Sequence, residues 1–364
     1  MSKQFDENRR QFLSGGALRR SESKDLVPEK KDPLDRQASH FERYSKNAMA
    51  CEFELLLNMH QYPQAGESAL TAFAIFDSVE EQMSIYQESS ELSHVNQNAS
   101  REPISLEQRL FDVLNLAREI NNTTAGAFDI TALPLSRAWG FHQRQGSVPD
   151  DSQINEALEL VGMQNVLLDD AQRSVHFLAE GIRLDLGGIG KGFAIDLAAQ
   201  SLCSAGVNDF VLQGGQSSVS AAGTNIGGEM FDDAKESGGG WRIGLSHPTT
   251  PNFRLAEFDL QEQALGTSGT QRQGFFYKGR RFGHIIDPRT GFPTDHCLSS
   301  TVICNSAAAA DALATAFFVM QLEEVHDFCN KQPEVATILV YPDTKSGVRL
   351  ETFNCDKIVW RKLI

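Results

Sequence analysis

The sequence lacks any apolar run of about 18 residues, the length that a transmembrane helix requires, so it predicts no stable insertion into a membrane. It also lacks paired cysteines, because its six cysteines are scattered and none forms a C-x-x-C pair or a zinc-ligand set. Scattered cysteines in a chain of 364 residues are typical of reduced thiols, which favours a cytoplasmic location.

Positive charge is also in short supply. The chain has 33 Lys and Arg residues against 48 Asp and Glu residues, a net charge of -15. Proteins that capture nucleic acids need a basic face for the phosphates, so no nucleic-acid partner is predicted. An acidic surface mainly supports solubility.

Residues 1–45 are charged, poor in periodic apolar residues and interrupted by Pro28 and Pro33. They predict a loosely ordered arm, or one helix outside the main body. Arg9 and Arg10 open RRQFL, which looks like a twin-arginine export motif. A polar segment follows instead of the apolar stretch that an export signal needs. Export through a degenerate signal is therefore the alternative to the cytoplasmic prediction.

Residues 46–364 form the predicted main domain. Apolar spacings of three and four residues predict helices over 67–87, 105–124, 191–206 and 307–321. Short apolar or alternating runs predict strands over 48–58, 165–169, 174–178, 183–186, 209–213, 253–260, 300–304, 336–341 and 348–353. The glycine-rich stretch 223–240 predicts a mobile loop. Helices and strands without regular alternation indicate the α+β class.

The stretch DLGGIGKGFAID, residues 185–196, places glycines and a lysine between a predicted strand and a predicted helix. Backbone N–H groups at a helix start suit a pyrophosphate, and glycines let the backbone approach a ligand closely. The glycine spacing does not match G-x-G-x-x-G, and no Ser or Thr follows Lys191 as a phosphate loop requires. The loop alone leaves two interpretations open, a nucleotide phosphate site and a tightly packed strand–helix turn.

Two further segments carry chemistry. HIIDPRTG, residues 284–291, sets His284 near Asp287, which suits proton removal near neutral pH, although a lone histidine is more often structural. ADALATAFF, residues 310–318, sets Asp311 and Thr315 on one helix face, where carboxylate and hydroxyl oxygens suit Mg²⁺. An Asp that caps the helix or faces solvent is the competing interpretation.

Taken in order, these segments resemble the ApbE family, the FAD:protein FMN transferases. The matching segments run from AMACEFELLL at residue 48 through SIYQESSELSHVN, GAFDITALPLSRAWGF, DLGGIGKG, LQGGQSSVSAAG, TSG at 267–269 and HIIDPRTG to ADALATAFFVM, and the resemblance reaches about residue 361. It implies a tunnel-fold-like α+β architecture with mixed sheets and packed helices. It also implies Mg²⁺-dependent transfer of FMN from FAD to a Thr or Ser hydroxyl of an acceptor protein carrying a motif like D-x-x-[TS]-[GS]-A-[TS], with release of AMP.

The resemblance also assigns site residues. Flavin-nucleotide contacts are implied for Met49, Tyr86, Ala127, Phe128, Asp129, Asp185, Lys191 and Ile286. Metal ligands are implied for Asp311, Thr315 and, through its carbonyl, Gly188. His284, with Asp287 nearby, matches the pair proposed to handle the acceptor proton. The alternatives within the same site are an Mg²⁺-dependent FAD pyrophosphatase and a flavin-binding protein without catalysis.

The sequence departs from the family pattern at four places. Met49-Ala50-Cys51 stands for Met-Gly-Thr, so backbone approach at Ala50 is less free. Ala314 stands where some relatives have an acid, Thr270 follows TSG, and GGQSS replaces GG followed by Asp or Asn. We expect these differences to bear on acceptor choice while the core set of site residues stays complete.

Overall fold

The computed structural model describes residues 41–143, 145–225, 239–250, 252–270 and 274–364. Arg9, Arg10 and most of the predicted loop 223–240 lie outside these ranges. The first strand, β1, runs from Phe41 to Ala48 and pairs along its whole length with β2. Residues 41–45, which the sequence assigned to the N-terminal arm, therefore belong to the main sheet.

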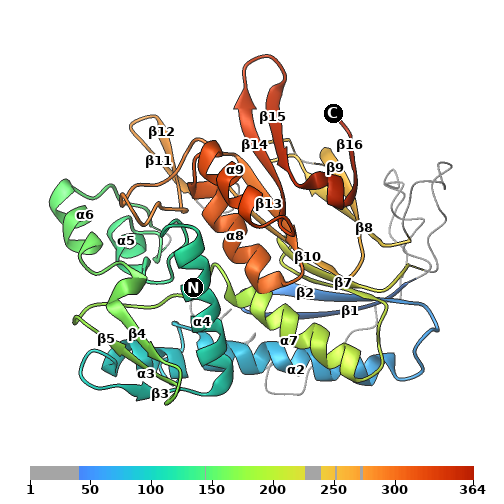
Figure 1. The fold of residues 1–364 in the computed structure, drawn as a ribbon, viewed down its shortest axis with the longest axis horizontal. Coiled ribbons are helices and arrows are strands. Elements are labelled where there is room, and N and C mark those ends of the chain that lie inside the picture. Colours follow the sequence, from blue (N-terminus) through green and yellow to red (C-terminus); the bar gives the residue numbers. More distant parts are fainter. Residues whose placement is uncertain (1–40, 144, 226–238, 251, 271–273) are drawn as a thin grey trace, which may run out of the picture.

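Helices and strands alternate irregularly along the chain (Figure 1). The helices are α2 (Ala65–Met83), α3 (Glu91–Asn98), α4 (Gln108–Thr123), α5 (Leu133–Ala138), α6 (Asp151–Leu158), α7 (Gly190–Ser204), α8 (Ala307–Val319) and α9 (Leu322–Lys331). Strands after β1 are β2 (Cys51–Asn58), β3 (Ile104–Ser105), β4 (Val166–Asp169), β5 (Ser174–Phe177), β6 (Phe210–Gly214), β7 (Ser218–Ala222), β8 (Trp241–Ser246), β9 (Arg254–Leu260), β10 (Gln263–Gly269), β11 (Gly274–Tyr277), β12 (Arg280–Gly283), β13 (Ser299–Cys304), β14 (Ala336–Asp343), β15 (Gly347–Phe353) and β16 (Val359–Lys362). Within the described ranges, no helix has the length and apolar composition needed to cross a bilayer.

The centre of the fold is an eight-stranded antiparallel sheet in the order β1-β2-β6-β7-β10-β13-β14-β15. Helices α2, α7 and α8 cover one of its faces (Figure 1), where Phe210 and Val302 are buried. The other face packs on the small sheet β16-β9-β8 through Val211 and Ile303. Since successive side chains on a strand point to opposite faces, each inner strand contributes to both cores.

A third apolar cluster joins α5 and α6 to the segment around residue 286. Trp139 lies at its centre, and its indole N–H donates a hydrogen bond to the carbonyl of Gly291 at 2.9 Å. The hairpin β11–β12 packs against this cluster through Phe275 and Phe282. The aromatic segment after α4 therefore packs against HIIDPRTG and helps to hold it in place.

Helix α8 is the most deeply buried helix of the fold and is apolar on nearly every side, as expected for a helix inside a core. The Asp196 carboxylate on α7 binds its first turn, accepting from the amides of Ala307 at 2.7 Å and Ala308 at 3.0 Å and from the Ser306 hydroxyl at 2.7 Å. A carboxylate there satisfies otherwise unpaired N–H groups and the positive helix end. Burial raises the pKa of Asp196, against these hydrogen bonds, which lower it.

Two glycines bring α8 close to its neighbours. A Cβ atom on Gly192 of α7 would lie 2.1 Å from the carbonyl oxygen of Ala307. A Cβ on Gly266 of β10 would lie 2.4 Å from the carbonyl oxygen of Ala310. Both contacts are with main-chain atoms, which cannot rotate away. The absence of side chains at these two positions therefore sets the distances from α8 to α7 and β10.

We predict that Gly192→Ala lowers the free energy of unfolding by about 1–3 kcal/mol, the usual cost of overpacking a core. The added methyl group would push α7 away from the first turn of α8. Urea unfolding followed by circular dichroism measures the change.

Gly190→Ala is the matched control on the same helix. Its Cβ would lie 3.7 Å from Leu186 Cβ and from Met49 Cε, an ordinary contact. Alanine also favours a helix over glycine by about 0.5–1 kcal/mol, so this variant should be neutral or slightly more stable. Equal losses of stability in both variants would show that the close contact at Gly192 is not the cause.

Candidate active site

The glycine loop approaches the site without a preceding strand, which corrects the strand predicted over 183–186. Both main-chain groups of Leu184 bond the side-chain amide of Asn96 on α3, its N–H at 2.7 Å and its carbonyl at 2.9 Å. The amide of Asp185 donates to the carbonyl of Ile130 at 2.7 Å. Side chains and a loop replace the sheet partner that the apolar alternation suggested. Helix α7 then starts at Gly190, so Lys191 lies in its first turn.

The carboxylate of Asp311 is the focus of the site. It is buried on α8, and one of its oxygens accepts from the Lys191 ammonium at 3.2 Å and from the Gly192 amide at 3.0 Å. The Ser218 hydroxyl, at the start of β7, lies 2.7 and 2.8 Å from the two oxygens. A buried carboxylate needs such partners because an isolated charge in the core is very unfavourable. The predicted helix position of Asp311 is confirmed, and its side chain faces the glycine loop.

Thr315 lies one turn after Asp311 on the same face. Its hydroxyl donates to the Asp311 carbonyl at 3.2 Å and lies 3.0 Å from the Ser268 hydroxyl of β10. A Cβ on Gly188 would lie 3.7 Å from this Thr315 oxygen and 3.1 Å from Phe128 Cε2. The fold therefore gathers the glycine loop, the GAFDIT segment and α8 at one point.

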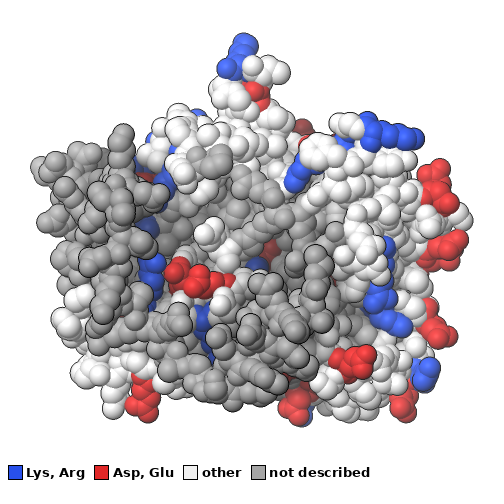
Figure 2. Space-filling model, turned by 180° about the vertical axis from the view of Figure 1, so that it is seen from behind, with Lys and Arg blue, Asp and Glu red and all other residues white. Residues whose placement is uncertain are grey.

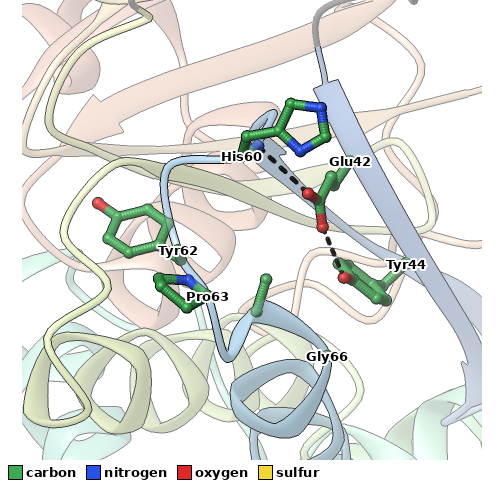
Figure 3. A pocket seen from close by; sticks show the side chains of 7 residues that line it. Glu42, Tyr44, His60, Tyr62, Pro63 and Gly66 are labelled. Atoms are coloured by element: carbon green, nitrogen blue, oxygen red, sulfur yellow. Dashed lines mark hydrogen bonds between the residues drawn. The ribbon is translucent and has the colours of Figure 1, made fainter.

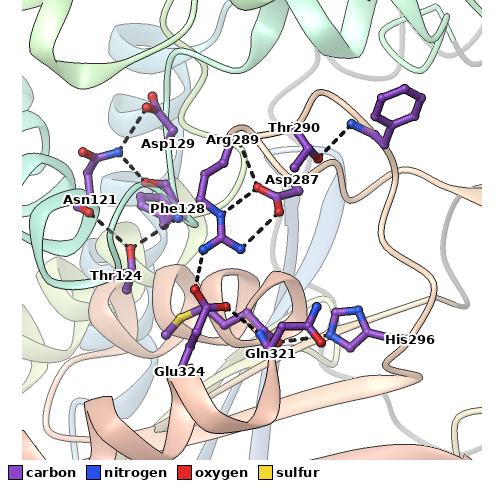
Figure 4. A network of polar contacts seen from close by, with 12 residues as sticks. Asn121, Thr124, Phe128, Asp129, Asp287, Arg289, Thr290, His296, Gln321 and Glu324 are labelled. Carbon is purple, nitrogen blue, oxygen red and sulfur yellow. Dashed lines mark hydrogen bonds and ion pairs between the residues drawn. The ribbon is translucent and has the colours of Figure 1, made fainter.

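Asp129 organises the GAFDIT segment from within (Figure 4). One carboxylate oxygen accepts from the amide and hydroxyl of Thr131 at 2.8 and 2.5 Å. The other accepts from Asn121 at 3.1 Å and from the Met163 amide at 3.2 Å. Burial raises the pKa of Asp129 in spite of these bonds. Its carboxylate holds the loop together, and the neighbouring Ala127 and Phe128 are buried in the core.

Met49 and Ala50 form the turn between β1 and β2, and both have positive φ angles, 49° and 58°. Such angles cost a residue with a side chain roughly 1 kcal/mol or more. The Met49 amide donates to the Glu80 carboxylate of α2 at 2.8 Å, which helps to hold this turn. The Met49 side chain packs beside Gly190, so the turn lies against the glycine loop.

A cationic and aromatic group surrounds Asp185. Burial raises the pKa of Asp185, while its bond from the Gly187 amide at 2.9 Å and electrostatic interaction with His142 and Arg137 act to lower it. His142 stacks on the Tyr86 ring with the centroids 5.3 Å apart and the planes at 7°. Tyr86 is 74% exposed, so one face of an aromatic pair is open beside the glycine loop. Tyr86 and Asp185 were predicted as site residues from the sequence, whereas His142 and Arg137 were not.

HIIDPRTG lies against the GAFDIT segment, where a Cβ on Gly126 would lie 3.7 Å from Arg289 Cγ, and Figure 4 shows Arg289 and Asp287 across from Phe128 and Asp129. Arg289 grips Asp287 with its Nε at 3.0 Å and a terminal nitrogen at 3.1 Å, and donates to Glu324 of α9 at 2.7 Å. Burial acts to raise the pKa of Glu324, but Arg289 outweighs it and the pKa is lowered. Ile286 is buried and pairs with Pro293, and His284 follows β12 directly. In this geometry the Asp287 carboxylate holds Arg289 and fixes the loop.

A pocket of about 480 Å³ lies elsewhere, between β1 and the start of α2 (Figure 3). It is lined by Glu42, Tyr44, His60, Tyr62, Pro63, Ala65 and Gly66. None of the residues predicted from the sequence is among them. The candidate active site is therefore the hydrogen-bonded cluster around Asp311, which contains predicted site residues, and not this pocket.

The donor set around Asp311 suits a small hard cation. Within the described ranges no group of three or more His, Cys, Asp and Glu side chains could hold a metal ion. A soft-metal site therefore finds no support there. Carboxylate, hydroxyl and carbonyl oxygens remain, and these are the ligands that Mg²⁺ accepts while keeping several waters. The ammonium of Lys191 already occupies a cation position beside Asp311.

Besides His142 and Arg137, three participants lay outside the sequence prediction: Ser218, Ser268 and Arg289. Ser218 and Ser268 lie in GGQSS and TSG, two segments that the sequence analysis used without assigning a role to the serines. Arg289 lies inside HIIDPRTG, where a fork-shaped guanidinium next to an Asp is a recognisable pairing signal.

Comparisons with known proteins bear on the family and the fold. A sequence model described as the ApbE family matches residues 49–339. A Vibrio cholerae protein named FAD:protein FMN transferase is 32% identical over 251 residues, covering 68% of this chain and 71% of its own. One of the same name from Haemophilus influenzae is 31% identical over 279 residues, covering 74% and 77%.

Solved structures agree with the fold. The ApbE protein of Thermotoga maritima superposes with a TM-score of 0.76 at 26% identity, covering 87% of this chain and 98% of that one. The flavin transferase ApbE of Vibrio cholerae gives 0.73 at 26% identity, covering 87% and 99%. The predicted α+β class and tunnel-fold-like architecture are confirmed, and the chain belongs to the ApbE family.

Proposed function

We propose that this protein transfers FMN from FAD to a Thr or Ser hydroxyl of an acceptor protein, with Mg²⁺ bound and AMP released. The chain is a transferase enzyme of the class that its relatives' names state, with FAD as substrate and a protein as acceptor. The observation that carries the finer proposal is the buried Asp311, which meets Lys191, Ser218 and the Gly192 amide at one point.

Asp311 and Thr315, with the carbonyl of Gly188, would hold the metal. Bound there, Mg²⁺ supplies positive charge to the pyrophosphate and to the leaving AMP. Lys191 balances the Asp311 charge at 3.2 Å, and its flexible side chain lets the same ammonium group reach a phosphate oxygen. The amides at the start of α7 offer hydrogen bonds to phosphate oxygens. These groups bind and orient the FMN phosphorus.

His284 is the proposed general base. It takes the proton from the acceptor hydroxyl, whose oxygen forms a bond to the FMN phosphorus while the bond from phosphorus to the AMP oxygen breaks. The pair Asp287–Arg289, tied to Glu324, fixes the turn of HIIDPRTG that follows His284. Proton removal is thus assigned to HIIDPRTG, and binding of the phosphorus to the glycine loop and α8.

The acceptor is proposed to carry a D-x-x-[TS]-[GS]-A-[TS]-like motif, and the reaction to take place in the cytoplasm. Incubation with FAD, Mg²⁺ and a peptide carrying this motif separates three outcomes by mass. A gain equal to FMN on the peptide means transfer. Free AMP with an unchanged peptide means FAD hydrolysis, and unchanged FAD means binding alone.

For the metal, we predict that Asp311→Asn raises the Mg²⁺ concentration for half-maximal transfer at least tenfold. Loss of a residue that only orients a metal ligand weakens metal affinity about 10–100-fold, and loss of the ligand itself should weaken it at least as much. Mg²⁺ should also raise the melting temperature of the parent protein and not of the variant. Chelation with EDTA should abolish transfer by the parent.

Asp327→Asn on α9, whose side chain is 74% exposed, is the matched control and should behave as the parent does. An unchanged Mg²⁺ requirement in Asp311→Asn would remove Asp311 from the proposed metal ligands.

For the base, we predict that His284→Ala slows FMN transfer by about 10²–10⁴-fold, the usual contribution of a positioned general base. FAD affinity should remain near the parental value, because His284 is not among the proposed nucleotide contacts, of which Ile286 alone lies in HIIDPRTG. Single-turnover transfer and quenching of flavin fluorescence measure the two quantities.

His94→Ala on α3, an exposed histidine, controls for the loss of an imidazole. Parental transfer rates in His284→Ala would assign the proton to another group. A loss of FAD binding would make His284 a binding residue instead.

A further inference from the structure

The hairpin β11–β12 is a rigid projection next to the proposed site (Figure 1). Its strands pair from Gly274↔Gly283 to Tyr277↔Arg280. The turn residues Lys278 and Gly279 have φ angles of 48° and 80°. Two positive φ angles in a two-residue turn match the natural twist of a hairpin. Among the described strands, β11 and β12 pair only with each other.

One face of the hairpin is anchored. The Phe275 and Phe282 rings stack at 5.5 Å, Phe275 lies 5.5 Å from Phe141, and Phe282 lies 5.3 Å from Trp139, centroid to centroid. Aromatic pairs at such distances contribute about 0.5–1.5 kcal/mol beyond their buried area. The hairpin therefore has a fixed position on the body of the protein.

The opposite face presents aromatic surface. Phe276 points away from this anchor, since neighbouring side chains on a strand alternate, and it is 75% exposed. Tyr277, next to the turn, alternates back to the face of Phe275 and is 45% exposed, with the Lys278 ammonium 5.2 Å from its ring centroid. Phe292, directly after HIIDPRTG, is 51% exposed and lies 6.2 Å from Trp139, centroid to centroid. A single exposed Phe is ordinary, but exposed aromatic side chains on a hairpin and beside it are typical of a protein interface.

The hairpin is also basic in an acidic protein. Residues 274–283 include Lys278, Arg280 and Arg281 and no Asp or Glu, against a net charge of -15 for the chain. Arg280 pairs with Asp295 at 2.7 Å, with both side chains 64% exposed, and Arg281 donates to the carbonyl of Thr270. Of these three cations, Arg280 is the one that forms an ion pair among the described residues. Blue side chains mark this projection at the upper right of Figure 2.

The chain connects this surface directly to the proposed base. Strand β12 ends at Gly283, and His284 is the next residue. The tip at Lys278 and Gly279 lies about 16 Å further along, at about 3.3 Å per strand residue. An extended partner segment lying along the hairpin spans this distance in about five residues. A hydroxyl at His284 and an acidic side chain at the tip then belong to one continuous peptide.

We infer that the hairpin binds an acidic segment of the acceptor protein, about five residues from the hydroxyl that receives FMN. Lys278 at the turn meets the acidic side chains, with Arg280 beside it paired to Asp295, and Phe276 provides apolar contact. This inference rests on the proposed transferase function. It identifies the acceptor by charge: a segment with carboxylates flanking the modified residue.

The test uses two synthetic peptides with the same D-x-x-T-G-A-T core. One carries Asp pairs about five residues from the acceptor Thr on both sides, and the other carries Lys pairs there. The full chain and its Lys278→Glu and Phe276→Ser variants are compared by kcat and KM for FMN transfer, by fluorescence anisotropy of labelled peptide, and by FAD affinity.

We expect the parent to favour the Asp peptide. Lys278→Glu should raise KM for that peptide about three- to tenfold and remove the preference, as expected for an interfacial charge. Phe276→Ser should raise KM about tenfold, as for a central aromatic contact. The kcat at saturating peptide and the FAD affinity should not change, because no hairpin residue is assigned to the chemistry.

Matched controls lie on other exposed sites. Lys345→Glu makes the same charge change at the turn of the hairpin β14–β15, and Leu178→Ser removes an apolar side chain that is 58% exposed. Both should leave KM at the parental value. Equal KM values in the hairpin variants and these controls would overturn the inference.

Two further outcomes separate the rival explanations. If the parent does not transfer FMN to either peptide, the proposed function fails, and peptide binding by anisotropy alone decides on the hairpin. Sedimentation with phosphatidylglycerol vesicles tests a lipid surface as the occupant. Vesicle binding that Lys278→Glu removes, with peptide KM unchanged, would reassign the hairpin to membranes and overturn the inference.

Discussion

The structure depends on one buried carboxylate in one buried helix. Asp311 lies inside α8, and this helix packs tightly because Gly192 and Gly266 have no side chains at the contact. The same closeness lets the Gly192 amide and the Lys191 ammonium reach the carboxylate. The close packing of α8 and the hydrogen bonds to Asp311 therefore depend on the same short distance between α7 and α8. If α8 moved outwards to accept a larger neighbour, the carboxylate would lose the donors that make its burial tolerable.

Much of the fold could be predicted from the sequence because the helices that pack in the core have regularly spaced apolar residues. The helices containing Phe76, Leu114, Ala198 and Phe317 show apolar spacing over many residues, and each formed near its predicted bounds. Shorter elements such as β7 and β10 carry polar, small residues that line the site. Their pairing depends on long-range partners, so local pattern could not reveal them. Neither of these central strands is among those predicted from the sequence.

Site residues could be predicted as a set, but not what each one does. An Asp in an alanine-rich helix pointed to a special environment, and Asp311 indeed has one. Asp129 and Asp287 look equally suited to ligand contact in the sequence. In the fold, Asp129 is saturated by Thr131, Asn121 and the Met163 amide, and Asp287 is held by Arg289. Only the three-dimensional structure shows that Asp129 and Asp287 hold their loops in shape, while Asp311 joins α8 to α7 and β7.

Charge raises a last question, because FAD is an anion and the chain carries a net charge of -15. Screening resolves it: at physiological salt the Debye length is about 8 Å, so most acidic surface groups do not act on a ligand in the site. Groups within that range decide the local potential. They include Lys191 and the positive end of α7, with Arg137 near Asp185. An acidic exterior thus keeps the protein soluble, while a few cations placed by α7 and its neighbours make one region attractive to a pyrophosphate.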